Sequence, residues 1–162
     1  MPSSWIRRLL LATAAIAITT APAIANSTSD VLTIKVVVEQ SCLILSNPLD
    51  FGTYSAGQQP ALEAEGIISY VGCGPGTLTI SLDGGTSGKT MDRKMSSGNS
   101  KLSYQLYRNS ARNEVWGNGS DAFQRPLLEP GAGSVTVYGR IPGGQTVAGG
   151  TYIDTVNLTL SF

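Results

Sequence analysis

Apolar and polar residues alternate along most of this chain, a pattern that predicts β-strands. Alternating runs cover residues 32–39, 43–45, 66–73, 77–82, 101–108, 135–139 and 155–162. Clusters of Gly, Pro, Asn and Ser separate them, as turns do. A sustained helical stripe is missing, and residues 61–65 could form one helical turn at most. Six or seven short strands indicate one all-β domain, an immunoglobulin-like β-sandwich.

The first 25 residues have the layout of a secretory signal peptide. Arg7 and Arg8 form a positive start, residues 9–18 an apolar run, and Ala23-Ile24-Ala25 a small-x-small cleavage site. The apolar run is shorter than the roughly 20 residues that cross a bilayer. We therefore expect residues 1–25 to be removed on export, and we expect the mature chain not to span a membrane.

Composition narrows the classes of function. The chain has 11 Lys+Arg against 11 Asp+Glu and only 14% charged residues, which disfavours a nucleic-acid binder that neutralises phosphates. It has no His, so Ser-His-Asp and Cys-His catalysis and His-containing zinc sites are excluded. We expect no catalytic residues, no metal and no cofactor, and we interpret the protein as a non-enzyme.

The two cysteines, Cys42 and Cys73, are read in the light of export. Outside the cytoplasm an even pair predicts a disulfide. In the chain-entropy model a loop of this length contributes roughly 3–4 kcal/mol. A metal site would need further soft ligands, which the neighbouring sequence does not offer.

Several loop motifs allow both a chemical and a structural interpretation. Trp116-Gly117-Asn118-Gly119 could be a sugar-binding loop, but a single Trp more often packs on the domain edge. Asp83-Gly84-Gly85 predicts a hairpin turn rather than a phosphate cradle, because no helix follows it.

Charged side chains receive similar interpretations. Three aspartates could be imagined as acid/base carboxylates, although turn and capping roles are commoner; they are Asp83, Asp92 and Asp154. We expect Asp154 to shape the start of the last strand. A loose basic cluster is interpreted as a solvated face and consists of Arg93, Lys94, Lys101, Arg108 and Arg112.

Residues 27–39 precede the first cysteine and carry four regularly spaced apolar side chains: Leu32, Ile34, Val36 and Val38. In one interpretation they form the first strand of their own sandwich. In the other they add a strand to a neighbour's sheet, where backbone hydrogen bonds give affinity and alternate side chains fill pockets. The pattern alone leaves both open.

The motifs together resemble a known family. Cys42 followed by Leu49-Asp50-Phe51-Gly52-Thr53-Tyr54 resembles its opening, and further matching segments follow in order: Cys73, 80–85, 93–95, 102–108, 116–119, 137–142 and 150–156. This set, from about Leu32 to Phe162, is similar to the spore coat protein U domain, shared with subunits of archaic (Csu-type) chaperone–usher pili.

The resemblance implies an incomplete sandwich that lacks its seventh strand. A periplasmic chaperone lends a strand until the outer-membrane usher exchanges it for the next subunit's extension. The chain would then divide into a signal peptide (1–25), a donor-strand extension (26–40) and a sandwich domain (41–162). Leu32, Ile34, Val36 and Val38 would be the inserted side chains. The edge of the acceptor groove would include Val156, Leu158, Leu160 and Phe162.

The resemblance also implies a function. We expect a structural subunit of a surface fimbria, with neighbouring pilin subunits as partners and adhesion or biofilm formation as its role. Archaic tip adhesins carry a second, N-terminal domain, so a stalk or minor subunit is the expectation here. The alternative is a coat protein or surface binding protein that closes its own sandwich with residues 31–39. A carboxylate hydrolase is disfavoured by composition.

Overall fold

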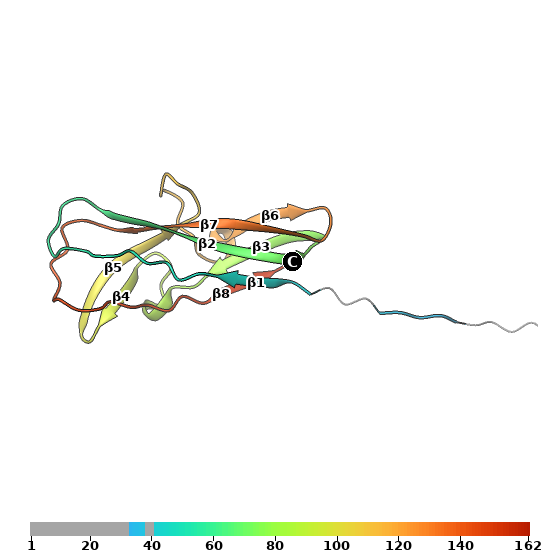
Figure 1. Ribbon diagram of the computed structural model, residues 1–162, viewed down its shortest axis with the longest axis horizontal. Helices are drawn as coiled ribbons and strands as arrows, with labels where there is room; N and C mark the ends of the chain where they lie inside the picture. The colour runs from blue at the N-terminus through green and yellow to red at the C-terminus, as the bar shows by residue number, and fades with distance from the viewer. Residues whose placement is uncertain (1–32, 38–40) are drawn as a thin grey trace, which may run out of the picture. The chain divides into compact units, whose positions relative to one another are not determined.

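The computed structural model of the protein describes residues 33–37 and 41–162 (Figure 1). These two stretches belong to separate units. Thr33–Val37 carry no strand assignment, and Ile34 and Val36 are 86% and 80% exposed. The expected signal peptide, as well as Leu32 and Val38, lies outside the described residues. No helix in the described part of the chain is long and apolar enough to cross a membrane.

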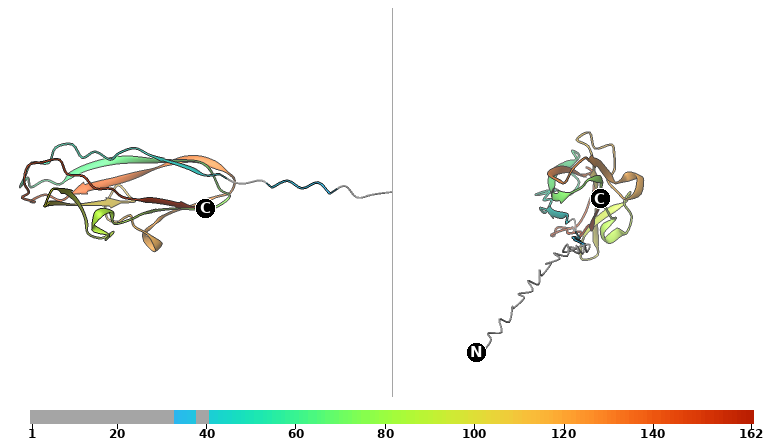
Figure 2. Two further views of the ribbon diagram at one scale, coloured as in Figure 1. Left: turned by 90° about the horizontal axis from the view of Figure 1, so that it is seen from below. Right: turned by 90° about the vertical axis from the view of Figure 1, so that its right-hand side faces the viewer.

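Residues 41–162 form two antiparallel sheets that lie in two layers (Figure 2). One sheet has the strand order β1-β2-β7-β5-β4, and the other has the order β6-β3-β8. This arrangement confirms the all-β sandwich expected from the alternating pattern. The strands are β1 (Leu43–Ser46), β2 (Leu62–Cys73), β3 (Gly76–Leu82), β4 (Arg93–Ser97), β5 (Ser100–Tyr107), β6 (Phe123–Leu127), β7 (Gly131–Ile141) and β8 (Leu158–Ser161).

Residues 61–65, which could have formed one helical turn at most, form none: Leu62 pairs with Ile141 and begins β2. Two other local expectations are wrong. Asp83-Gly84-Gly85 is not a hairpin turn. The chain passes there through the 3-10 helix η1 (Gly85–Ser87) from β3 in one sheet to β4 in the other. The last strand begins at Leu158 rather than Thr155.

Two strands escaped the alternation pattern. In β4 one inward position is Arg93, so the run does not alternate between apolar and polar residues. In β6 the sequence contains Pro126, which lacks the N–H of a central strand. The structure places β6 at the edge of its sheet, where a proline is tolerated.

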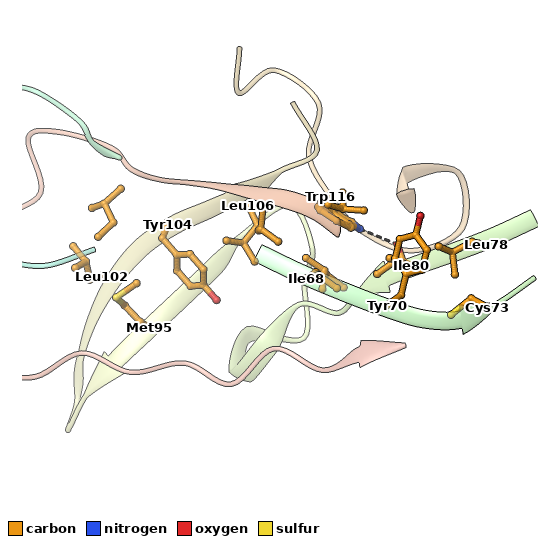
Figure 3. Packing of buried hydrophobic residues seen from close by; sticks show 14 residues of the cluster. Ile68, Tyr70, Cys73, Leu78, Ile80, Met95, Leu102, Tyr104, Leu106 and Trp116 are labelled. Atoms are coloured by element: carbon orange, nitrogen blue, oxygen red, sulfur yellow. Dashed lines mark hydrogen bonds between the residues drawn. The ribbon is translucent and has the colours of Figure 1, made fainter. Parts of the chain in front are cut away.

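The core lies between the sheets and is made of aliphatic and aromatic side chains from both (Figure 3). Trp116 is fully buried, and its indole Nε1 donates to the Ile80 carbonyl at 2.8 Å. Its ring is therefore not available to a sugar, so the loop-lectin alternative is wrong and the packing interpretation holds. Full burial of such side chains stabilises the fold by roughly 1.5–3 kcal/mol each.

The predicted disulfide joins Cys42 to Cys73, with Cα atoms 4.5 Å apart. It connects the residue before β1 to the last residue of β2. A β-bulge between Val71 and Cys73 turns the buried Cys73 inward. The bulge residue is Gly72 with φ +76°, and a Cβ there would lie 2.6 Å from the Ser41 carbonyl oxygen, so this position requires glycine.

Arg93 is not part of a solvated face. It is fully buried, and its guanidinium donates to carbonyl oxygens of Leu82, Asp83, Thr90 and Trp116 at 2.6–3.1 Å. A further bond of 2.6 Å reaches the side-chain oxygen of Gln105. Burial lowers the pKa of Arg93, but an arginine stays charged because its ordinary pKa is so high.

Two of the four remaining basic residues of the cluster also differ from the expectation. The side chain of Arg112 is 10% exposed and that of Arg108 is 27% exposed, because each binds a neighbouring glutamate. The lysines do face solvent: Lys94 is 40% exposed in its side chain, and Lys101 is exposed. The arginines are thus structural ties rather than a basic surface.

We expect Arg93→Met to lower the free energy of unfolding by at least about 3 kcal/mol, because several buried acceptors lose their donor at roughly 1–3 kcal/mol each. Urea denaturation followed by tryptophan fluorescence measures this. Lys94→Met is the matched control and should change stability by less than about 0.5 kcal/mol. Equal losses in both variants would contradict the tie assigned to Arg93.

Candidate functional site

A groove of about 840 Å³ opens along one side of the sandwich. Its two rims are extended segments: residues 46–54, from the last residue of β1 onward, and residues 147–156 before β8. Its floor is apolar and consists of core side chains from both sheets: Ile68, Leu82, Met95, Leu102, Tyr104, Leu106, Val137 and Ile141. Figure 3 shows Met95, Leu102 and Tyr104 at one end of the core and Cys73, Leu78 and Trp116 at the other.

The first rim leaves β-pairing soon after β1. The N–H of Asn47 still donates to the Ile67 carbonyl at 3.4 Å, but Pro48 has no N–H to continue the ladder. Phe51 then packs over Gly139, where a Cβ would lie 2.7 Å from its ring. The rim ends at Tyr54, whose hydroxyl donates to the Pro142 carbonyl at 3.2 Å.

The second rim is tied to its surroundings by single contacts rather than a ladder. Ser96 and Ile153 exchange two backbone hydrogen bonds of 2.9 and 3.0 Å, which hold the middle of the rim to β4. Tyr152 donates its hydroxyl to the Ala148 carbonyl at 2.7 Å. The rim therefore keeps most of its backbone free of strand pairing, as far as the described residues show.

Two carboxylates anchor the second rim. Asp154 accepts from the Tyr104 hydroxyl at 2.6 Å and from the backbone N–H of Thr86 at 2.8 Å; the Thr86 hydroxyl binds it too. Asp83 accepts from the backbone N–H of Asn157 at 2.9 Å and from its side-chain amide at 2.6 Å. Asp154 thus shapes the approach to the last strand, as its place in the sequence suggested.

These contacts set the protonation of both anchors. Partial burial by itself raises the pKa of each, but the hydrogen bonds that their ionised forms accept outweigh it. The net effect holds the pKa of Asp83 and of Asp154 below the ordinary value. Burial and the bond to Asp154 raise the pKa of Tyr104, so that its hydroxyl remains a donor at neutral pH.

The same contacts bear on the hydrolase alternative. Asp83 and Asp154 spend their oxygens on the backbone and side chains that they anchor, which is the capping role favoured from sequence. Asp92 is half exposed and forms a 3.1 Å ion pair with Lys94. Among the described residues, no group of three or more His, Cys, Asp and Glu could hold a metal ion.

Two of the four residues that the resemblance assigned to the groove edge line this groove. Val156 and Leu158 line it. Leu160 instead packs against the core beyond the groove lining, and Phe162 is 44% exposed. Residues 46–54 and 147–154 of the rims were not singled out as groove residues, although residues 49–54 and 150–154 belong to motifs quoted for the family resemblance. The sequence signal for the rims was that Pro48 and Gly149-Gly150 interrupt the alternating pattern of the strands.

Residues 28–159 match the Spore Coat Protein U domain. The chain belongs to this family. The match confirms the resemblance seen in the sequence, and it covers the alternating extension as well as the sandwich. In this chain, the described residues 41–162 form two antiparallel sheets, and the groove lies between two extended rims.

One relative and one solved structure are informative for this Spore Coat Protein U domain chain. Protein U from Myxococcus xanthus is 36% identical over 114 residues, which make up 69% of this chain and 60% of that protein. A crystal structure of the CsuC–CsuE chaperone–tip adhesion subunit pre-assembly complex, from archaic chaperone–usher Csu pili of Acinetobacter baumannii, matches with a TM-score of 0.53 and 23% identity. The match covers 75% of this chain and 39% of that one, and it supports the fold.

Acid should loosen the second rim. Asp154 has a lowered folded pKa, so its contribution to stability is present above the unfolded value of about 3.9 and is lost as the pH falls through the folded value. We expect Asp154→Asn to cost about 1–3 kcal/mol at pH 7 and to lose less stability than the wild type between pH 7 and pH 3. Urea titrations at both pH values measure this. Asp92→Asn, at an exposed position, is the control, and its loss of stability between pH 7 and pH 3 should equal that of the wild type. The same loss in Asp154→Asn would count against the anchoring role of Asp154.

Proposed function

We propose that this chain is an exported structural subunit of a surface fimbria, assembled by a chaperone–usher route through donor-strand complementation. The observation that carries the proposal is the apolar groove of about 840 Å³ between two rims that are mostly unpaired. An inserted strand would supply backbone partners to both rims and side chains to the floor. Adhesion or biofilm formation is the role we propose for the fibre.

The N-terminal extension supplies a segment of the right chemistry. Ile34 and Val36 are exposed in the structure, and Leu32 and Val38 continue the same alternation in the sequence. Burying four aliphatic side chains contributes roughly 1.5–3 kcal/mol each, before the cost of ordering the segment. Strand addition of this kind combines backbone hydrogen bonds with pockets for alternate side chains.

Chain length favours insertion into a second copy rather than into the same domain. Folding back with residues 39–42 as the connection would pair Val38 with Leu43, and hence Leu32 with Leu49. The polar residues 27–30 would then face the rim over residues 51–54, and the apolar run would lie outside most of the groove. A strand from another copy has no such restriction on its register, so it can place the apolar run over the floor.

The proposed partners follow from the same groove. Unpaired strand edges beside an apolar groove are an aggregation hazard, so we propose that a periplasmic chaperone covers them until the subunit is polymerised. The outer-membrane usher and neighbouring subunits complete the route. We propose that residues 1–25 direct export, residues 26–40 donate the strand and residues 41–162 accept one, first in the periplasm and then at the cell surface.

A coat protein is the second candidate, because the family is described by a spore coat component. Such a protein would close its own groove with residues 31–39 and would not polymerise by strand exchange. The two candidates therefore differ in whether adjacent copies stay joined in detergent.

Val36→Asp should abolish polymers, because an inserted strand would bury an unpaired carboxylate in the apolar groove. Val37→Asp is the matched control, since in an inserted strand this neighbouring side chain would point away from the groove floor, so assembly should stay intact. The measurement is denaturing electrophoresis, without heating, of protein recovered from the surface of the exporting cell. Wild type and Val37→Asp should give a ladder that collapses on boiling.

Two results would count against the proposal. A normal ladder from Val36→Asp, with export unchanged, removes the donor role from this segment. A single monomer band from the wild type, with residues 27–39 protected from protease, indicates the coat protein candidate instead.

A further inference from the structure

The outer face of the β1–β2 pair carries an uncovered apolar face, made of Leu43, Leu45, Ile67 and Val71. Their side chains are 58%, 58%, 51% and 51% exposed. Leu43 lies opposite Val71 in the register, and Leu45 lies opposite Ser69. Ile67 lies two positions before Ser69 and therefore on the same face of β2. An antiparallel sheet normally presents polar side chains to water on its solvated face, so this apolar face is unusual.

The remainder of the same sheet surface is treated differently. Over the far ends of β2 and β7, Arg112 lies on the Tyr138 ring at 5.5 Å and binds Glu63 at 3.0 Å. Arg140 adds a 2.7 Å ion pair to Glu63. Beside the apolar face, by contrast, the outward positions of β7 are the small, uncharged Ala132, Ser134 and Thr136.

The lack of charge on this face indicates what kind of partner it could bind. The face itself and its β7 neighbours carry no charge, so they offer nothing to a phosphate or an anionic lipid headgroup. An uncharged, mainly apolar protein surface fits it best. In the proposed fibre, another copy of the chain would offer such a surface.

Chain length places that copy within reach. Val38, the last apolar residue of the extension, is five residues before Leu43, a span of at most roughly 18 Å. Leu43 begins β1 directly after the disulfide residue Cys42. A copy that receives the extension in its groove is therefore tethered beside the apolar face (Figure 1 shows β1 and β2 side by side).

We propose that the apolar face of Leu43, Leu45, Ile67 and Val71 is a second subunit contact, onto which the copy that accepts the extension packs. The inference rests on the proposed donor-strand function, since the extension is what tethers the copy. It adds a surface-to-surface contact that fixes how consecutive subunits are oriented, which strand insertion alone leaves to a short linker.

Site-specific photocross-linking tests the contact on the full chain. A benzoylphenylalanine replaces Leu45 on the apolar face, or Met91, which is 69% exposed between η1 and β4, as the control. Irradiated surface material is boiled, so that strand-exchanged polymers dissociate and only covalent dimers remain. We expect dimers of the chain from position 45 and a background level from position 91. Adding Val71→Glu should reduce the position-45 dimer at least about tenfold, equivalent to 1.4 kcal/mol of lost contact.

The unheated ladder, read from the same samples, separates the two proposals. A ladder without a position-45 dimer overturns the apolar contact and leaves the fimbrial function standing. A position-45 dimer without a ladder keeps a contact between copies but overturns both its tethering by the extension and the fimbrial function. Neither signal overturns both proposals. A covalent adduct with a different protein in place of the dimer also overturns the inference, because the face then has another occupant.

Discussion

Backbone groups at a strand edge need hydrogen-bond partners, and in this domain the two rims of the groove lack most of theirs. One half of the core, around Cys73, Leu78 and Trp116, is closed by both sheets. The other half, around Met95 and Leu102, is the floor of the groove. The closed half gives the domain a packed core, and in the proposed function an added strand covers the open half. Donor-strand assembly is the proposed outcome of that single constraint.

A polar network keeps the groove formed without that strand. Arg93 holds the carbonyls of Leu82 and Asp83 at the end of β3, and the Asp83 carboxylate in turn holds Asn157 just before β8. Asp154 ties the second rim to Tyr104 in β5. Buried polar groups are stable only when satisfied, so these bonds fix the rim at a definite place. A preformed groove loses less conformational entropy on strand insertion than a collapsed one would.

The outer surface of the five-stranded sheet is also divided into two different halves. Its far half is covered by the arginine and glutamate ties around Arg112, while the half beside the disulfide is left apolar. In the proposed fibre, the groove would accept a strand from one neighbouring copy. The apolar face would orient the other neighbouring copy, which receives this chain's own extension. The Cys42–Cys73 bridge stands at the start of β1, where the extension meets the domain, and holds β1 and β2 in register.

The sequence by itself determined the features that depend on near neighbours. Period-two alternation predicted most strands, and export together with an even cysteine pair predicted the disulfide. Tertiary structure alone decided the rest, because the causes are distant in the chain. The burial of Arg93 depends on carbonyls from β3 and the Trp116 loop, and Leu62 joins a strand because it pairs with Ile141. The rims are defined by an absence of pairing between segments about 100 residues apart, and the local breaks at Pro48 and Gly149-Gly150 do not reveal which distant segments stay unpaired.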